Sequence, residues 1–196
     1  MGFLSVLSFA HKLAAERLKS SGIAVDATAG TGADTLILAK AAGPRGRVFA
    51  FDIQQEALEL TRRRLMKEPS ERLAEVSLFQ DSHSNMQAHI PAEYHGKISV
   101  IMFNLGYLPS EQADKKIITS SDSTLPALEA SLKLLSPGGI VTIVVYPGHE
   151  GGGQEAAAVE AWASALPQRT AQAIVYRGLQ RPNAPFLIAL ERKKPL

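Results

Sequence analysis

The feature that most constrains the fold is a regular alternation between apolar, strand-like runs and segments in which apolar residues recur at helical spacing. The strand-like runs are residues 23–27, 47–52, 75–80, 98–104, 140–146, 171–177 and 185–192. The segments with helical spacing are residues 3–20, 33–42, 54–67, 123–136 and 159–166. Strands that alternate with helices through short loops form parallel sheets, so the pattern predicts an α/β fold with a doubly wound, mostly parallel sheet of seven strands.

Local patterns add detail to this sheet. Residues 100–103 are a continuous apolar run, which is typical of a strand covered on both faces. The helix over 123–136 is expected to end at the Pro-Gly-Gly sequence of residues 137–139. The last two strands are joined by residues 178–184, and we expect them to form an antiparallel pair that supplies an antiparallel edge strand to the sheet.

The composition is that of one globular domain. The chain has 196 residues, of which 45% are hydrophobic and 20% are charged, and it contains no internal repeat, low-complexity segment or linker. We therefore expect a single domain over residues 1–196. The absence of cysteine excludes a disulfide scaffold, a Cys-ligated zinc site, an iron–sulfur cluster and a thiolate nucleophile, and we assign no metal-binding residue.

The N-terminal segment and the net charge bear on location and partners. The apolar start is followed at once by charged residues such as Lys12, Glu16 and Arg17, which favours a helix over a signal peptide. No uncharged run approaches the roughly 18 residues that a membrane span needs, so we expect a cytoplasmic protein with no membrane partner. The net charge is only +2, so an anionic partner would have to be held by a local patch.

The most informative stretch is Val-Asp-Ala-Thr-Ala-Gly-Thr-Gly-Ala-Asp-Thr at residues 25–35, where the first strand turns into the next helix. Gly30 and Gly32 permit a tight turn and the close approach of a ligand. Thr35 stands where a dinucleotide motif would have its third glycine, which disfavours a nicotinamide dehydrogenase. Asp26 suits a ligand with a cationic amine. A tight turn that binds no ligand is the alternative.

Acidic and short polar residues follow the next two strands. Asp52 ends the second strand, about 20 residues beyond the glycine turn, where a carboxylate can accept hydrogen bonds from the two hydroxyls of an adenosine ribose. It can also cap the helix over 54–67. Asp81, Ser82 and His83 follow the third strand, where they can read the edge of an adenine ring or cap their own loop.

The fourth strand ends at Asn104, which is followed by Leu-Gly-Tyr-Leu-Pro up to Pro109. All four polar motifs thus lie at the carboxyl ends of strands, the edge where open α/β sheets bind their ligands. The sequence therefore predicts one binding site that these four strand ends share.

These segments together resemble the class I S-adenosylmethionine-dependent methyltransferases and, more narrowly, a small bacterial family labelled rRNA methylases. Members of that family have been assigned as tRNA wobble-uridine methyltransferases, which convert 5-aminomethyluridine to its methylaminomethyl form. The resemblance extends over most of the chain, in the order of the family's motifs. The segments that carry it are residues 8–11, 25–35, 51–54, 81–83, 104–109, 114–119 and 146–149.

The resemblance implies S-adenosylmethionine as the cofactor and assigns a place to each matching residue. The cofactor-binding half would span about 21–103 and the substrate-side half about 104–196. The residues expected around the methionine part are Gly30, Thr31, Gly32 and Asp34, and Asp26 and Thr28 of the same turn are also expected to bind the cofactor. Those expected at the ribose and the adenine are Asp52, Gln54, Asp81, Ser82 and His83. The chain departs from the family at Thr31, where Asn is usual, and at Ser110-Glu111, where Gly-Gly is frequent in a shorter loop.

Residues 104–109 resemble the Asn-Pro-Pro-Tyr loop of methyltransferases that act on amino groups, with Leu105-Gly106 in place of the prolines. A sulfonium is already a strong electrophile, so such an enzyme has mainly to desolvate and align a neutral nitrogen lone pair. The carbonyl of Asn104 can accept a hydrogen bond from the amine, and Tyr107 can stack on a base. A plain turn residue and a core aromatic are the respective alternatives.

An ammonium ion must lose its proton before it can accept a methyl group. His149, in the turn after the fifth strand, is the first candidate acceptor, and His11 on the first helix is the second; proton loss to water is the alternative. Basic groups lie at residues 62–64, 115–116 and 192–194. Lys115-Lys116 is the expected phosphate contact because it follows the Asn104 loop.

The expected function is therefore methylation of the amine on a tRNA wobble uridine. The expected partner is the tRNA anticodon loop, and a homodimer would extend the surface that recognises it. Methylation of another RNA site or of a small-molecule amine, and a non-catalytic S-adenosylmethionine-binding module, are the alternatives.

Overall fold

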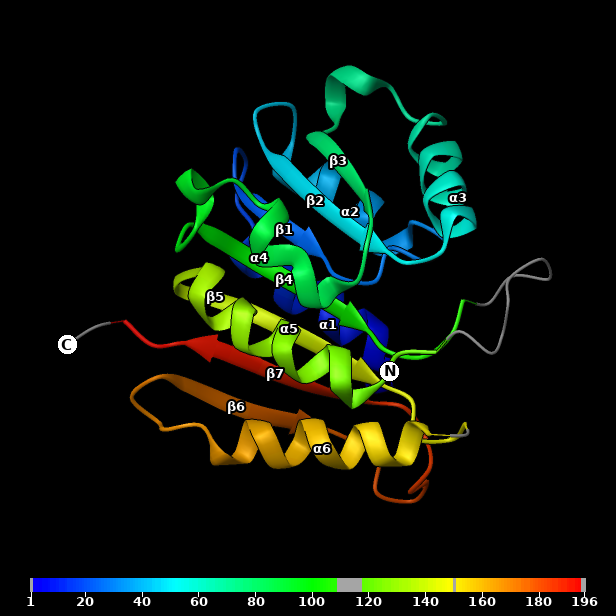
Figure 1. Ribbon diagram of the computed structural model, residues 1–196, viewed down its shortest axis with the longest axis vertical. Helices are drawn as coiled ribbons and strands as arrows, with labels where there is room; N and C mark the ends of the chain where they lie inside the picture. The colour runs from blue at the N-terminus through cyan, green and yellow to red at the C-terminus, as the bar shows by residue number, and fades with distance from the viewer. Residues whose placement is uncertain (1, 109–117, 150, 195–196) are drawn as a thin grey trace.

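The structure, a computed structural model, describes residues 2–108, 118–149 and 151–194. Seven strands form one sheet in the order β3-β2-β1-β4-β5-β7-β6 (Figure 1). The strands are β1 (Ile23–Asp26), β2 (Arg47–Asp52), β3 (Glu75–Gln80), β4 (Ile98–Asn104), β5 (Leu135–Val145), β6 (Ala171–Tyr176) and β7 (Phe186–Arg192). The helices are α1 (Val6–Arg17), α2 (Ala33–Ala42), α3 (Gln55–Leu65), α4 (Met86–His89), α5 (Ser121–Leu134) and α6 (Gly152–Ala165).

The strand pairing confirms the predicted fold class. The first five strands, β1 through β5, are all parallel to their neighbours among one another. β7 runs antiparallel to both of its neighbours, β5 and β6. The antiparallel pairing therefore lies at the β6 edge of the sheet, where the sequence predicts it. Strand order reverses between β1 and β4, because the chain adds β2 and β3 on one side of β1 and the later strands on the other. Such a reversal leaves a crevice at the carboxyl ends of the central strands.

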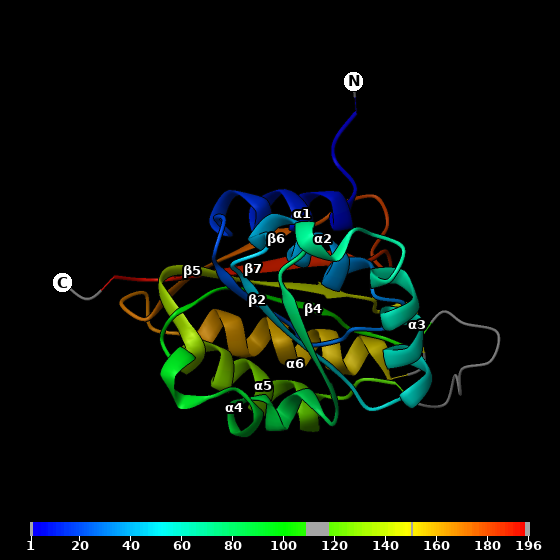
Figure 2. The same cartoon turned by 90° about the horizontal axis from the view of Figure 1, so that it is seen from above.

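Helices cover both faces of the sheet. Figure 2 shows α1 and α2 on one face and α4, α5 and α6 on the other. The side chains of β4 alternate between these layers: Val100 and Met102 join the core under α1 and α2, whereas Ile101 and Phe103 join the core under α5 and α6. Burial on both faces explains why residues 100–103 show a continuous apolar run instead of an alternating one.

Some element boundaries differ from the sequence expectation. The helix expected over 123–136 ends at Leu134, and β5 begins at Leu135 instead of Ile140. The Pro-Gly-Gly sequence therefore does not end the helix: it lies within β5, in an extended segment whose pairing with β4 shifts register. α1 is shorter than the expected 3–20, because the Ser5 side chain accepts a hydrogen bond from the Ser8 N–H and caps the helix there. No helix in the described ranges is long and apolar enough to cross a membrane.

Candidate active site

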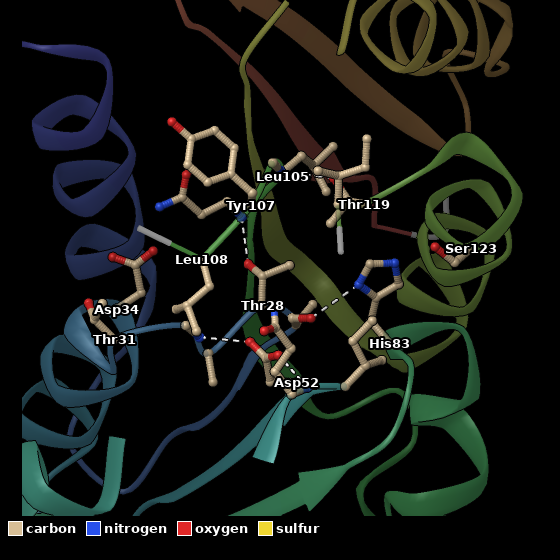
Figure 3. A pocket seen from close by; sticks show the side chains of 18 of the residues that line it. Thr28, Thr31, Asp34, Asp52, His83, Leu105, Tyr107, Leu108, Thr119 and Ser123 are labelled. Atoms are coloured by element: carbon tan, nitrogen blue, oxygen red, sulfur yellow. Dashed lines mark hydrogen bonds between the residues drawn. The ribbon is translucent and has the colours of Figure 1, made fainter. Parts of the chain in front are cut away.

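A cavity of about 340 Å³ opens at the carboxyl ends of the central strands, where the strand order reverses (Figure 3). All of the site residues predicted from the sequence line it except Asp26 and Gly32. Those that line it are Thr28, Thr31, Asp34, Asp52, Gln54, Asp81, Ser82, His83, Asn104, Tyr107, His149 and the backbone of Gly30. The topology thus brings together four motifs that are far apart along the chain.

The two glycines of the first turn have different structural roles. Gly30 has a φ of +52° and its N–H donates to Asp52 Oδ2 at 2.9 Å. Gly32 has a φ of +77°, and a Cβ at this position would lie 2.7 Å from Thr61 Cα. Gly32 is therefore required where the start of α2 packs against α3, and it does not line the cavity.

Asp26 differs from the sequence expectation, because its carboxylate turns into the protein below the cavity. Its Oδ1 accepts a hydrogen bond from the Thr28 N–H at 3.1 Å, and its Oδ2 accepts one from the Thr35 hydroxyl at 2.5 Å. The side chain is fully buried, and burial raises the pKa of this carboxyl group above its ordinary value. The structure thus assigns Asp26 to the support of the turn and not to the lining of the cavity.

Asp52 faces the cavity and joins two parts of its wall. Its Oδ2 accepts from the Gly30 N–H and its Oδ1 accepts from the Gln54 N–H, both at 2.9 Å. Asp52 is not the N-cap of the following helix, because α3 begins at Gln55 with Gln54 as its N-cap and no side chain caps it. Partial burial raises the pKa of Asp52, although these backbone N–H groups oppose that effect. A carboxylate offers about four lone-pair sites, so Asp52 retains capacity to accept from a ligand hydroxyl.

The loop after β3 both lines the cavity and caps itself. Asp81 accepts hydrogen bonds from the Ser82 N–H at 2.7 Å and the Asn85 side chain at 2.9 Å, and its other oxygen lies 2.6 Å from His89 Nε2. The contact with His89 holds the pKa of Asp81 below its ordinary value. Ser82 accepts from the N–H of Ser84 at 3.2 Å. These bonds fix the loop whose side chains face the cavity.

His83 supplies a buried acceptor to the cavity wall. Its Nδ1 lies 3.2 Å from the carbonyl oxygen of Ala27, which can only accept, so Nδ1 carries the proton. Burial lowers the pKa of His83 to about 4, and the ring is therefore neutral near pH 7. Its Nε2 is buried without a hydrogen-bond partner among the described residues. Such an orphaned acceptor fits a ligand that brings an N–H or O–H donor.

Asn104 connects the two halves of the site. Its backbone N–H donates to Thr28 Oγ1 at 2.7 Å, which ties the end of β4 to the glycine turn. Its side chain hydrogen-bonds the Tyr146 hydroxyl, whose pKa is raised by burial and by the neighbouring Asp34 carboxylate. Sequence reasoning missed Tyr146, although its position at the end of β5 follows the same strand-end rule.

Tyr107 and His149 lie next to each other at the cavity. Their ring centroids are 6.0 Å apart with planes at 85°, and Tyr107 also forms a β-bridge with Ile118. The Tyr107 side chain is 48% exposed, which excludes the alternative of a core aromatic. Pro109, the Ser110–Asp114 loop difference and the phosphate contact expected at Lys115-Lys116 lie outside the described residues.

His11, the second candidate proton acceptor, does not itself line the cavity. Its Nε2 lies 2.6 Å from Asp34 Oδ1, and this hydrogen bond raises the pKa of His11 above its ordinary value. Asp34 therefore separates His11 from the cavity. The basic group at 62–64 includes one contact with the site, since Arg64 Nε donates to the carbonyl oxygen of Thr31 at 2.7 Å.

The charges of the cavity restrict its ligands. Three carboxylates, Asp34, Asp52 and Asp81, line it, and no lysine or arginine is among the described lining residues. A pyrophosphate would meet repulsion here, whereas a ligand with cationic groups and a ribose would meet complementary charge and acceptors. The cavity is therefore suited to S-adenosylmethionine and unsuited to a dinucleotide.

Comparisons with known proteins agree with this geometry. A protein-family model described as putative rRNA methylase matches residues 48–191. The chain is 38% identical over 191 residues to the chloroplastic tRNA (mnm5s2U34)-methyltransferase of Arabidopsis thaliana, covering 94% of this chain and 68% of that protein.

Solved structures show the same likeness over the whole fold. A putative rRNA methylase from Clostridium thermocellum superposes with a TM-score of 0.89 at 33% identity, over 98% of this chain and 100% of that one. A putative methyltransferase from Streptococcus mutans, solved in complex with SAH, superposes with a TM-score of 0.82 at 30% identity, over 97% and 99% of the two chains. The chain therefore belongs to the putative rRNA methylase family, a family of S-adenosylmethionine-dependent RNA methyltransferases.

Proposed function

We propose that the protein transfers a methyl group from S-adenosylmethionine to the amine of 5-aminomethyluridine at the wobble position of tRNA. The observation that carries this proposal is the position of Asn104 at the end of β4, where it lines the same cavity as three carboxylates and its side chain hydrogen-bonds Tyr146. The name of the Arabidopsis relative supports the choice of a modified uridine at tRNA position 34.

The cofactor would be held by residues from three strand ends. Asp52 would accept from the ribose hydroxyls, Gly30, Thr31 and Asp34 would border the methionine part, and Ser82 and His83 would border the adenine. When bound, the cofactor supplies an electrophilic methyl group on a positively charged sulfur.

The acceptor residues would then align a neutral amine. The Asn104 carbonyl accepts a hydrogen bond from the amine N–H and thereby aims the nitrogen lone pair, and the hydrogen bond with Tyr146 restrains the Asn104 side chain. Tyr107, half exposed at the cavity, stacks on the uracil ring. His149, which packs edge-on against Tyr107, takes the proton that the ammonium form of the substrate must lose.

Recognition of the tRNA would be local. The net charge of +2 favours contacts with an anticodon loop over contacts with a long stretch of backbone, and a second subunit would extend the surface. We propose a cytoplasmic homodimer as the acting form and the whole chain as one domain.

The test is mass spectrometry of tRNA nucleosides from cells with and without the gene, repeated with purified protein and the tRNA from the deficient cells. We expect the deficient cells to accumulate the aminomethyl nucleoside and the protein to add one methyl group to it. Unchanged wobble nucleosides, together with loss of a methyl group elsewhere in RNA or from a small amine, would replace this substrate with one of those alternatives.

A further inference from the structure

The backbone that carries Asn104 and Tyr107 lacks the rigidity that prolines give to comparable loops. Leu105-Gly106 stands where two prolines would restrict φ covalently. Gly106 has a φ of +142°, a conformation that side-chain-bearing residues rarely adopt, and glycine loses more conformational freedom on ordering than any other residue. Contacts from elsewhere must therefore hold this loop in one geometry.

Thr119 supplies these contacts from the segment just before α5. The Gly106 N–H donates to Thr119 Oγ1 at 2.8 Å, and the Thr119 N–H donates to the Gly106 carbonyl oxygen at 2.9 Å. Both backbone polar groups of Gly106 are thus paired with one residue. The next residue, Tyr107, forms an antiparallel bridge with Ile118, the neighbour of Thr119.

Glu155 fixes Thr119 in turn. It lies in the first turn of α6 and its side chain is buried, with a residue exposure of 2%. Its Oε2 accepts a hydrogen bond from the Thr119 hydroxyl and its Oε1 accepts one from the Thr124 hydroxyl, both at 2.7 Å. Because the Thr119 hydroxyl donates to Glu155, its lone pairs remain directed toward the Gly106 N–H.

This carboxylate has no structural counterion in the described part of the chain. Burial of a charge without a cation costs free energy, which hydroxyl donors and the N-terminal end of a helix offset only in part. The charge also makes each hydrogen bond to the two hydroxyls stronger than a neutral bond. These stronger hydrogen bonds restrain Thr119, and through it the loop that must align the reacting nitrogen.

We propose that Glu155 is a positioning residue for methyl transfer, which acts through Thr119 and Gly106 to hold Asn104 and Tyr107 in the geometry that the acceptor amine needs. The assignment of a role in methyl transfer rests on the proposed function. Glu155 is not among the described residues that line the cavity, so it acts without touching cofactor or substrate.

The test compares Glu155→Gln, Thr119→Val and Thr119→Ser with the parent protein. Glu155→Gln replaces one acceptor by an amide donor, and Thr119→Val removes the hydroxyl, so both loosen Gly106; Thr119→Ser keeps the hydroxyl. We expect the Gly106 amide hydrogen to exchange roughly 5- to 10-fold faster in the first two variants and at the parent rate in Thr119→Ser. Thr142→Val, the same change at a buried site on β5, is the control and leaves exchange at Gly106 unchanged.

Kinetics on unmethylated tRNA then separates positioning from binding. We expect kcat to fall by roughly 10-fold or more in Glu155→Gln and Thr119→Val with S-adenosylmethionine affinity within about twofold of the parent, and Thr119→Ser to recover most of the rate. A parent-like kcat in Glu155→Gln, or unchanged exchange at Gly106, overturns the proposal. Hydrogen exchange needs no substrate, so the contact network is tested even if the parent protein does not methylate this tRNA, an outcome that would count against the proposed function instead.

Discussion

Asp26 and Asp52 end neighbouring strands, yet only Asp52 reaches the cavity. The difference lies in the partners. The Thr28 N–H and the Thr35 hydroxyl draw the Asp26 carboxylate inward, whereas the partners of Asp52 are backbone N–H groups at the rim of the site. Spacing along the chain does not distinguish the two, since both follow an apolar run.

This contrast predicts that substitution of Asp52 weakens cofactor binding and that substitution of Asp26 does not. Asp52→Ala is expected to weaken S-adenosylmethionine binding by about 1.5–3 kcal/mol, or on the order of 10- to 150-fold, because the ribose hydroxyls lose a charged acceptor. Asp26→Asn is expected to leave the affinity within about threefold, because an amide can accept from Thr28 and donate to Thr35. Titration calorimetry measures both. Equal losses in the two variants would contradict the assignment of Asp26 to structural support.

Asn104 and Tyr146 predict a loss of rate without a loss of cofactor. Asn104→Ala is expected to lower single-turnover methyl transfer to tRNA by roughly 10²-fold, and Tyr146→Phe by roughly 10-fold, with cofactor affinity unchanged. The proposed reason is that the Asn104 side chain orients the amine and that its hydrogen bond with the Tyr146 hydroxyl restrains it. Tyr107→Ala is the comparison, since loss of stacking is expected to weaken tRNA binding by about 1–3 kcal/mol as well. A parent-like rate in Asn104→Ala removes the amine-positioning role.

At the scale of elements, the apolar strand β5 contains a buried threonine, Thr142, whose hydroxyl lacks a hydrogen-bond partner in the described part of the chain. Thr142 is fully buried in the middle of this strand, and its hydroxyl has no hydrogen-bond partner among the described residues. Its neighbours across the sheet are Met102 of β4 and Ala189 of β7, neither of which offers a side-chain acceptor of ordinary strength. Burial of an unpaired hydroxyl costs free energy that a methyl group would not.

Thr142→Val is therefore expected to raise the free energy of unfolding by about 1 kcal/mol without changing methyl transfer. Valine keeps the branched shape and the strand preference of threonine, so the strand itself should not change. Urea denaturation of the two proteins measures the difference. A destabilised variant would mean that the hydroxyl makes a hydrogen bond in solution.

At the scale of the whole molecule, stability depends on groups buried beside the site. His83 has a folded-state pKa of about 4 because burial disfavours its charged form, against 6.5 in an unfolded chain. Between these values the unfolded chain binds a proton that the folded protein does not. Lowering the pH from about 6.5 to about 4 thus favours unfolding through His83, by about 3 kcal/mol in total. Asp26 acts oppositely, since its raised pKa makes the folded protein hold a proton that the unfolded chain has released.

The His83 contribution is isolated by comparing the parent with His83→Asn, whose amide N–H can still donate to the Ala27 carbonyl. We expect the parent to lose stability relative to this variant as the pH falls from 7 to 4.5, measured by urea denaturation at each pH. Asp26 is present in both proteins, so its effect cancels. A pH-independent difference between them would show that His83 is not buried in its neutral form.

The sequence by itself determined the order of strands and helices and the edge at which the site lies. It does so because apolar periodicity reports which faces are covered, and because the carboxyl ends of parallel strands meet at one edge. The strands over 47–52, 75–80 and 98–104 have the predicted limits. Family membership followed from motifs in fixed order along the chain.

Only the tertiary structure decided which of these polar residues face the cavity and which support it. Asp26 turns inward, His83 becomes a neutral buried acceptor, Tyr146 hydrogen-bonds the Asn104 side chain, and Glu155 of α6 accepts from Thr119. Each of these roles depends on contacts between segments distant along the chain, and on the burial that those contacts impose. Spacing and residue type carry no record of either, so such roles emerge only when the chain is folded.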